Sequence, residues 1–168
     1  MNEDVAVTEP ELEPAIYFGA IVAGALSLLP YISLLFFIVY IVGALAAVWF
    51  AINKRGQFLT YKDGAKLGFL SVFYGVMGAV IVVDIIWQFF DYQLWQKQNS
   101  DFLLSILNLF ASPSTLDAMK VGMAQNASKP FAWYVIIVQV IAGAICAAIF
   151  AAPSGLLGVK LFQGRAAR

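Results

Sequence analysis

The stretch from Pro14 to Ile52 contains no Asp, Glu, Lys or Arg, and it limits what the chain can fold into more than any other feature. A helix rises about 1.5 Å per residue, and the hydrocarbon core of a bilayer is roughly 30 Å thick. The stretch is therefore too long for one crossing and just long enough for two short ones. Its turn-prone middle includes Pro30, which predicts a transmembrane helical hairpin. A kink at Pro30 within one span is the alternative.

The composition is typical of a membrane protein. Of the 168 residues, 62% are hydrophobic and 12% are charged, whereas a soluble domain has about 45–50% apolar and about 25% charged residues. Such a chain has too few polar side chains to cover its apolar surface. We therefore predict an all-α integral membrane protein, a bundle of four transmembrane helices with short interfacial helices in the loop between spans three and four.

The boundaries of the spans follow from the positions of charged and helix-breaking residues. We expect an acidic flexible tail followed by a single transmembrane domain. The expected ranges are 1–13 for the tail, 14–168 for the domain, about 14–29, 33–52, 64–90 and 131–152 for the spans, and 91–130 for the outer loop. Thr60 and Asp63 have the spacing of a capping box at the start of the third span. Pro153 is expected to bend or break the helix after the fourth span.

The outer loop contains two candidate short helices, residues 101–111 and 114–127. The first groups Phe102, Ile106 and Phe110 on one face. This pattern is typical of a helix that lies on the membrane surface or over the mouth of a bundle.

Small residues recur in every predicted span. Several pairs are four residues apart, such as Gly64 and Gly68, and this spacing allows neighbouring helices to approach closely. The recurrence predicts a tightly packed bundle. The helix-packing positions that we predict are Gly19, Gly24, Gly43, Gly68, Gly75, Gly78 and Gly143.

The basic residues predict how the protein is oriented in the membrane. Four spans place both termini and the loop after Ile52 on one side, and this side holds seven of the ten Lys and Arg residues. By the positive-inside rule this side is cytoplasmic. We therefore expect a multi-pass protein with both termini in the cytoplasm.

Three segments carry a resemblance to a family. They are GALSLLPYIS (24–33), RGQFLTYKDGAKLGFLSVFYG (55–75) and GAICAAIFAAPSGLLG (143–158). Together they resemble uncharacterised small bacterial membrane proteins of the domain-of-unknown-function type, which have four predicted spans. The resemblance covers most of the chain between Gly19 and Lys160, except much of the outer loop. It implies a location in the cell inner membrane of a bacterium, and it carries no activity or functional residues to transfer.

Asp84 is the best candidate for chemistry within a predicted span, because ionisable side chains are costly in hydrocarbon. It lies 18 residues beyond Lys66, about 27 Å of helix rise, and so near the opposite edge of the bilayer. One interpretation is an ion- or proton-binding carboxylate, paired with Gln139 or with Lys66 of another subunit. The alternatives are a hydrated acid at the interface and a contact with a partner protein. Gln139 is expected chiefly to form an interhelical hydrogen bond.

Lys54, Arg55, Lys62 and Lys66 form a basic cluster between spans two and three. Basic side chains near a membrane surface attract anionic lipid headgroups, with about 1 kcal/mol for each residue. The cluster is therefore a candidate anionic-lipid contact. The alternative is that it serves only to determine topology.

The sequence predicts a function without catalysis. The chain has no His, its only cysteine is Cys146, and it lacks a phosphate-binding loop and a basic run typical of nucleic-acid binding. We expect no catalytic residues, cofactor, metal site or nucleic-acid partner. The expected function is that of a structural, accessory or interaction subunit in the lipid bilayer, which packs as a homo-oligomer or within a larger membrane complex. A small oligomeric transporter or channel that uses Asp84 is the alternative, and a membrane enzyme ranks below both.

Overall fold

The chain is helical in nearly all of the part that the structure describes. The computed structural model describes residues 11–29, 35–90, 94–127 and 133–166, and no strand occurs among them. The elements are α1 (Glu13–Leu28), α2 (Phe36–Trp49), the π-helix η2 (Phe50–Lys54), α3 (Tyr61–Phe90), α4 (Leu94–Leu107), α5 (Pro113–Ala127), α6 (Trp133–Cys146), the π-helix η3 (Ala147–Ala151) and α7 (Ala152–Ala166). The predicted turn at Pro30 and most of the predicted acidic tail lie outside the described residues.

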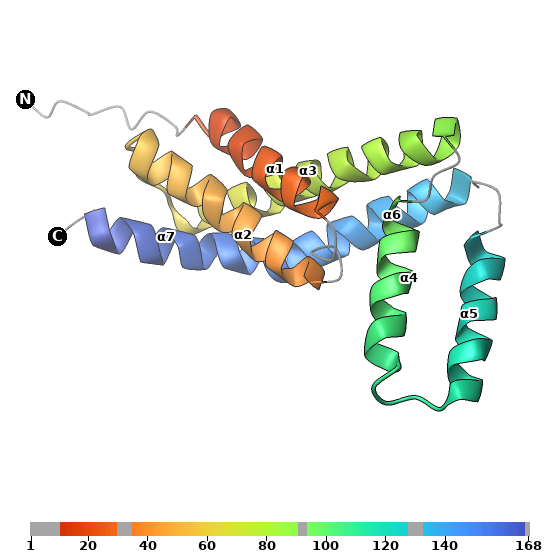
Figure 1. Cartoon of the computed structure of the whole chain (residues 1–168). Coiled ribbons are helices and arrows are strands. Elements are labelled where there is room, and N and C mark those ends of the chain that lie inside the picture. The colour runs from red at the N-terminus through yellow and green to blue at the C-terminus, as the bar shows by residue number, and fades with distance from the viewer. Residues whose placement is uncertain (1–10, 30–34, 91–93, 128–132, 167–168) are drawn as a thin grey trace, which may run out of the picture.

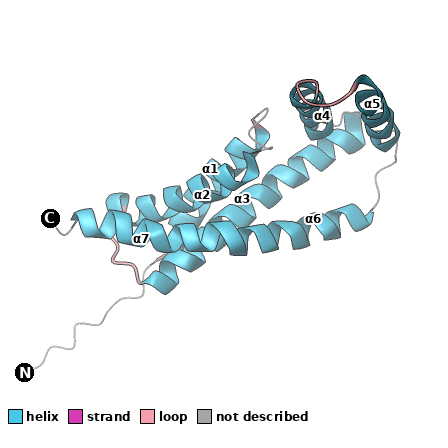
Figure 2. Ribbon diagram, turned by 90° about the horizontal axis from the view of Figure 1, so that it is seen from below, coloured by secondary structure: helices cyan, strands magenta, loops and turns pink. Residues whose placement is uncertain are grey.

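Helices α1, α2, α3 and α7 form a bundle (Figure 1). Helix α1 packs on α2 and α3, and α2 also packs on α7. The start of α1, the end of η2, the start of α3 and the end of α7 all lie at one end of the bundle (Figures 1 and 2). We call this the basic end, because Lys54, Lys62 and Lys160 lie there.

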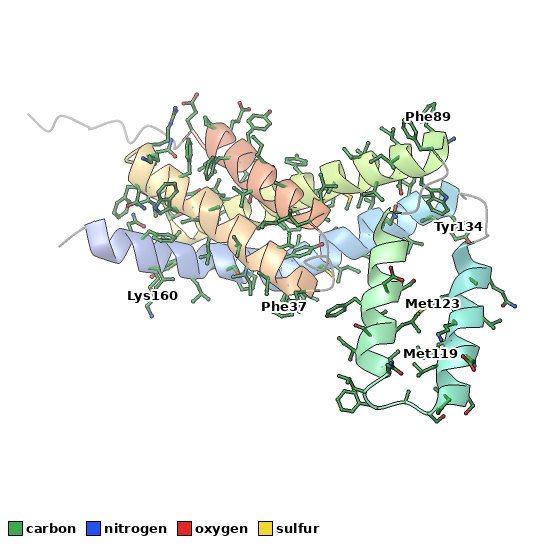
Figure 3. The ribbon with its side chains drawn as sticks, in the orientation of Figure 1. Phe37, Phe89, Met119, Met123, Tyr134 and Lys160 are labelled. Atoms are coloured by element: carbon green, nitrogen blue, oxygen red, sulfur yellow. The ribbon has the colours of Figure 1, made fainter. Side chains whose placement is uncertain are left out.

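Two helices continue past the α1–α2 hairpin. Phe37, near the start of α2, lies about midway along the bundle, whereas Phe89 on α3 and Tyr134 on α6 lie at the far end (Figure 3). Helix α3 has 30 residues and α1 has 16, which correspond to about 45 Å and about 24 Å. The far end, which we call the open end, therefore consists of α3 and α6 without cover from α1 and α2.

Three helical segments are long and apolar enough to cross a membrane: Phe37–Lys54, Tyr61–Phe90 and Tyr134–Gln163. The fourth apolar helix of the bundle, Glu13–Leu28, is shorter. The predicted all-α helical bundle is confirmed for the described residues, and the three long apolar helices indicate a membrane protein.

Small residues set the distance between the helices of the bundle. A Cβ atom at Gly19 would lie 2.6 Å from the Cβ atom of Ala47 and 2.8 Å from that of Ser71. A Cβ atom at Gly43 would lie 2.7 Å from that of Ala23. The glycines therefore allow α1 to touch α2 and α3 at once, as small residues do in packed membrane helices.

Local hydrogen bonds end η2 and start α3. Gly56 has a φ of 63°, and the N–H of Gln57 donates to the carbonyl oxygen of Ala51 at 3.0 Å, which closes the end of η2. The N–H of Thr60 donates to Oδ2 of Asp63 at 2.9 Å, and the N–H of Asp63 donates to Oγ1 of Thr60 at 3.2 Å. The predicted capping box is therefore confirmed.

The predicted break at Pro153 is wrong, because α6, η3 and α7 follow one another without interruption from Trp133 to Ala166. In a regular α-helix a proline lacks the N–H group that would donate, and its ring clashes with the carbonyl group four residues earlier. In η3 the N–H of Ala152 donates instead to the carbonyl oxygen of Ala147. This π-helical turn widens the helix directly before Pro153, so the helix continues past the predicted end of the fourth span.

Helices α4 and α5 form a separate hairpin at the open end. Both predicted short helices are present, but α4 begins earlier than expected, at Leu94, and ends at Leu107. The hairpin runs across the direction of α3 and α6 (Figures 1 and 2). Met119 and Met123 on α5 face α4 (Figure 3).

Candidate functional site

Asp84 of α3 and Gln139 of α6 lie side by side at the open end, with their side chains close enough to interact. Asp84 is half-buried. The Oε1 atom of Gln139 is buried and has no hydrogen-bond partner among the described residues. The structure thus brings together the two residues of the predicted ion or proton site, whereas ion or proton binding itself stays a prediction.

A groove of about 400 Å³ opens between α3 and α6 beside this pair. This volume lies within the range of about 300–1,000 Å³ that is usual for small-molecule sites. Asp84 and Gln88 are the polar residues of its lining, and the rest of the lining is apolar. Six of the apolar side chains that line it are Phe73, Met77, Ile81, Phe89, Ile136 and Val140.

The groove exists because α3 and α6 separate along their length. Towards the basic end the backbones of α3 and η3, which continues α6, touch, since a Cβ atom at Gly68 would overlap the carbonyl oxygen of Ala151. Further along, the contact is through a side chain, since a Cβ atom at Gly143 would lie 2.6 Å from Cε of Met77. Beyond this point the two helices diverge (Figure 2), and the groove lies between them.

Asp84 has no countercharge in the part of the chain that is described. The ion pairs found there are Arg55–Glu11 and Lys120–Asp117. Lys66 lies about 27 Å along α3 towards the basic end, so the predicted alternative pairing of Asp84 with Lys66 would require another subunit. A carboxylate that faces an apolar groove without a counterion is costly, which makes the groove receptive to a positive charge.

The predicted basic cluster lies at the opposite end of the bundle, and two of its members have partners. Nη2 of Arg55 lies 2.6 Å from Oε2 of Glu11 in an exposed ion pair. Nζ of Lys54 lies 5.7 Å from the centre of the Trp49 ring, in cation–π geometry. The two other members, which are exposed on the first turns of α3, are Lys62 and Lys66.

Sequence reasoning missed how the loop before α3 is held to α7. The side-chain amide of Gln163, in the orientation that satisfies both of its groups, donates to the carbonyl oxygen of Leu59 at 2.9 Å and accepts from its N–H at 3.2 Å. Beside this contact is a second cavity of about 550 Å³, whose lining includes Tyr61 and Lys160. No sequence pattern signals the contact, because its partner is backbone far away in the chain.

Most of the predicted packing glycines lie at helix–helix contacts within the described chain, whereas Gly78 lies at none. Gly78 is exposed, and no described atom lies within 4 Å of the place where its Cβ atom would be. It therefore faces away from the other helices of the chain, although it lies between packed positions of α3. The glycines with close neighbours are Gly19, Gly24, Gly43, Gly68, Gly75 and Gly143.

No group of three or more His, Cys, Asp or Glu side chains that could hold a metal ion occurs among the described residues. Cys146 is a free, half-buried thiol where α6 meets η3.

Comparison with known proteins found no relative of this chain. No protein-family model matches the chain, and no curated protein and no solved structure is significantly similar to it. The resemblance to small bacterial four-span proteins therefore stays a prediction, and the function has to be argued from the structure.

Proposed function

We propose that α1, α2 with η2, α3, and α6 with η3 and α7 cross a bacterial inner membrane as four spans. In this placement the hydrocarbon core extends along α3 from the level of Lys66 to that of Asp84, about 27 Å. Helix α1 has 16 residues, about 24 Å, which nearly matches this distance. Its packing on the longer α3 supports a crossing by a helix that is short for the roughly 30 Å core.

The basic end is placed in the cytoplasm in this proposal. Lys54, Lys62 and Lys160 lie at this end, whereas α3 and α6 carry a single charge, Asp84, in their outer halves. The positive-inside rule favours this orientation. Both termini are then cytoplasmic, and Lys62 and Lys66 face the inner headgroups, where they are the exposed members of the anionic-lipid contact.

The α4–α5 hairpin is placed along the outer surface of the membrane. It runs across the direction of the spans (Figure 1), so it is roughly parallel to the bilayer when the spans cross it. Leu109 and Phe110, in the turn between the two helices, are 74% and 84% exposed. Large exposed apolar side chains at this level favour the headgroup region.

The function that this geometry supports best is that of an accessory subunit that packs with a second span. The observation that carries the proposal is that the last span, Tyr134–Gln163, is poorly covered by the other helices. In its most apolar part 17% of the residues are buried, against 44% for Phe37–Lys54. Isoleucines at spacings of four form a stripe along its exposed side, namely Ile137, Ile141, Ile145 and Ile149. The partner proposed for this stripe is a second copy of the chain.

Disulfide cross-linking in membranes tests this proposal. In a Cys146→Ala background, Ile141→Cys is expected to form a covalent dimer under mild oxidation, because the stripe meets its copy. Ile21→Cys is the matched control, since Ile21 is 71% exposed but lies on α1. Cross-linking at both positions, or at neither, would argue against a specific contact through the stripe.

A small oligomeric transporter or channel is the second candidate, and the Asp84–Gln139 pair beside the groove favours it. Flux through proteoliposomes is expected to be lost in Asp84→Asn and kept in Asp101→Asn, which removes an exposed acid from α4. If the wild-type chain carries no ion or solute flux, this second candidate is refuted.

A further inference from the structure

The groove between α3 and α6 combines two properties that a ligand has to match. Its walls are apolar except for Asp84 and Gln88. The carboxylate of Asp84 has no basic partner among the described residues. A ligand that fits has an apolar body and a cationic group that donates hydrogen bonds.

The dimensions of the groove indicate the shape of the apolar body. From Phe73 to Asp84 the groove follows α3 for 11 residues, about 16 Å. This length is about half of the roughly 30 Å hydrocarbon core. A single extended hydrocarbon chain can therefore lie between α3 and α6 with its head group at the level of Asp84.

The negative charge of Asp84 determines which head group of a ligand fits the groove. An ammonium group supplies three N–H donors, and a charge-assisted hydrogen bond to a carboxylate is about twice as strong as a neutral one. A phosphate head group would instead place a second negative charge beside Asp84. Wall residues such as Met77 and Val140 carry no charge that would oppose the cation.

We propose that this groove is a binding site for an amphiphile with one hydrocarbon chain and a terminal ammonium group, which pairs with Asp84. The chain lies along Ile81 and Met77 towards Phe73, and the ammonium group donates to the Asp84 carboxylate. The level of Asp84 at the outer edge of the bilayer rests on the proposed four-span placement. The binding site itself is defined by α3 and α6 alone.

Native mass spectrometry of the full chain, released from a neutral detergent, tests the site with three probes that share one chain. The probes are dodecylammonium, dodecanol and dodecyl phosphate. The wild-type chain is expected to bind one dodecylammonium, and to bind each of the other two more weakly by at least about tenfold. Equal binding of dodecyl phosphate and dodecylammonium would overturn the proposal.

Different variants test the contribution of the Asp84 charge to binding and the contribution of the open groove. Asp84→Asn is expected to weaken dodecylammonium binding by at least about tenfold, whereas Asp84→Glu keeps most of it and Asp101→Asn leaves it unchanged. Val140→Trp fills the groove from α6 without a change of charge, and it is expected to weaken the binding of all three probes.

Unchanged binding in Asp84→Asn or in Val140→Trp would overturn the proposal, and so would an equal loss in Asp101→Asn. Val140→Trp keeps the test decisive if Asp84→Asn fails to elute as a folded protein in size-exclusion chromatography. Because the mass spectrum counts the ligands bound per chain in each oligomeric state, its outcome does not depend on whether the chain dimerises or transports.

Discussion

Gly155 of α7 lies so close to Gly64 of α3 that neither position has room for a methyl group. A Cβ atom at Gly155 would overlap the carbonyl oxygen of Gly64, and a Cβ atom at Gly64 would lie 2.8 Å from the carbonyl oxygen of Gly155. Contact between backbones is the arrangement that small residues allow in membrane helices. It joins α3, at the basic end, to the continuous helical run formed by α6, η3 and α7. At the open end α3 diverges from the α6 part of this run, and the groove lies between them.

Gly155→Ala is expected to lower the free energy of unfolding by about 1–3 kcal/mol, because the added methyl group forces the two backbones apart. Thermal unfolding of the purified protein in detergent measures the effect. Gly78→Ala is the matched control, since that position has no described atom within 4 Å and alanine favours a helix over glycine by about 0.5–1 kcal/mol. Equal losses at the two positions would contradict the close contact.

The capping box should contribute to stability as one unit. Thr60→Ala and Asp63→Ala are each expected to cost about 1 kcal/mol, and the double variant less than the sum, because either change removes hydrogen bonds that both residues share. Ser105→Ala is the control, since its Oγ atom donates to the carbonyl oxygen of Phe102 within α4, at 2.7 Å. Strict additivity of the two changes in thermal unfolding would show that the residues act separately.

Gln163 is expected to stabilise the basic end through the backbone of Leu59. Gln163→Leu leaves a buried N–H and carbonyl group of Leu59 without partners, and we expect a loss of about 1–3 kcal/mol in the free energy of unfolding. Gln163→Glu should have a smaller effect, because a carboxylate still accepts from the N–H. Breaking the exposed ion pair with Glu11→Gln should cost less than about 1 kcal/mol. A larger loss in Glu11→Gln than in Gln163→Leu would reverse this ranking.

The parts of the fold that the sequence predicts are those set by nearby residues. The sequence predicts a span over 64–90, and α3 extends over Tyr61–Phe90, because a long apolar run and the Thr60–Asp63 cap both act locally. The proximity of Asp84 and Gln139 was also predictable, since each is the polar residue at the same depth of its span.

The parts that the sequence does not predict depend on the neighbouring helix. Pro153 is normally a helix breaker, and the π-helical turn that accommodates it leaves no recognisable pattern. Gly78 has the same composition signal as Gly75, and only the packing of α3 shows that one faces α1 and the other does not. The groove likewise follows from the divergence of α3 and α6, which no local pattern encodes.

The proposed orientation predicts opposite accessibility of Lys62, at the start of α3, and Asp101, in α4. In a Cys146→Ala background, Asp101→Cys is expected to react with a membrane-impermeant maleimide in intact cells, because α4 lies on the outer surface. Lys62→Cys should react only after the cells are permeabilised, because the basic end faces the cytoplasm. The reverse pattern would invert the orientation, and labelling of both positions in intact cells would contradict a membrane between the two ends of the bundle.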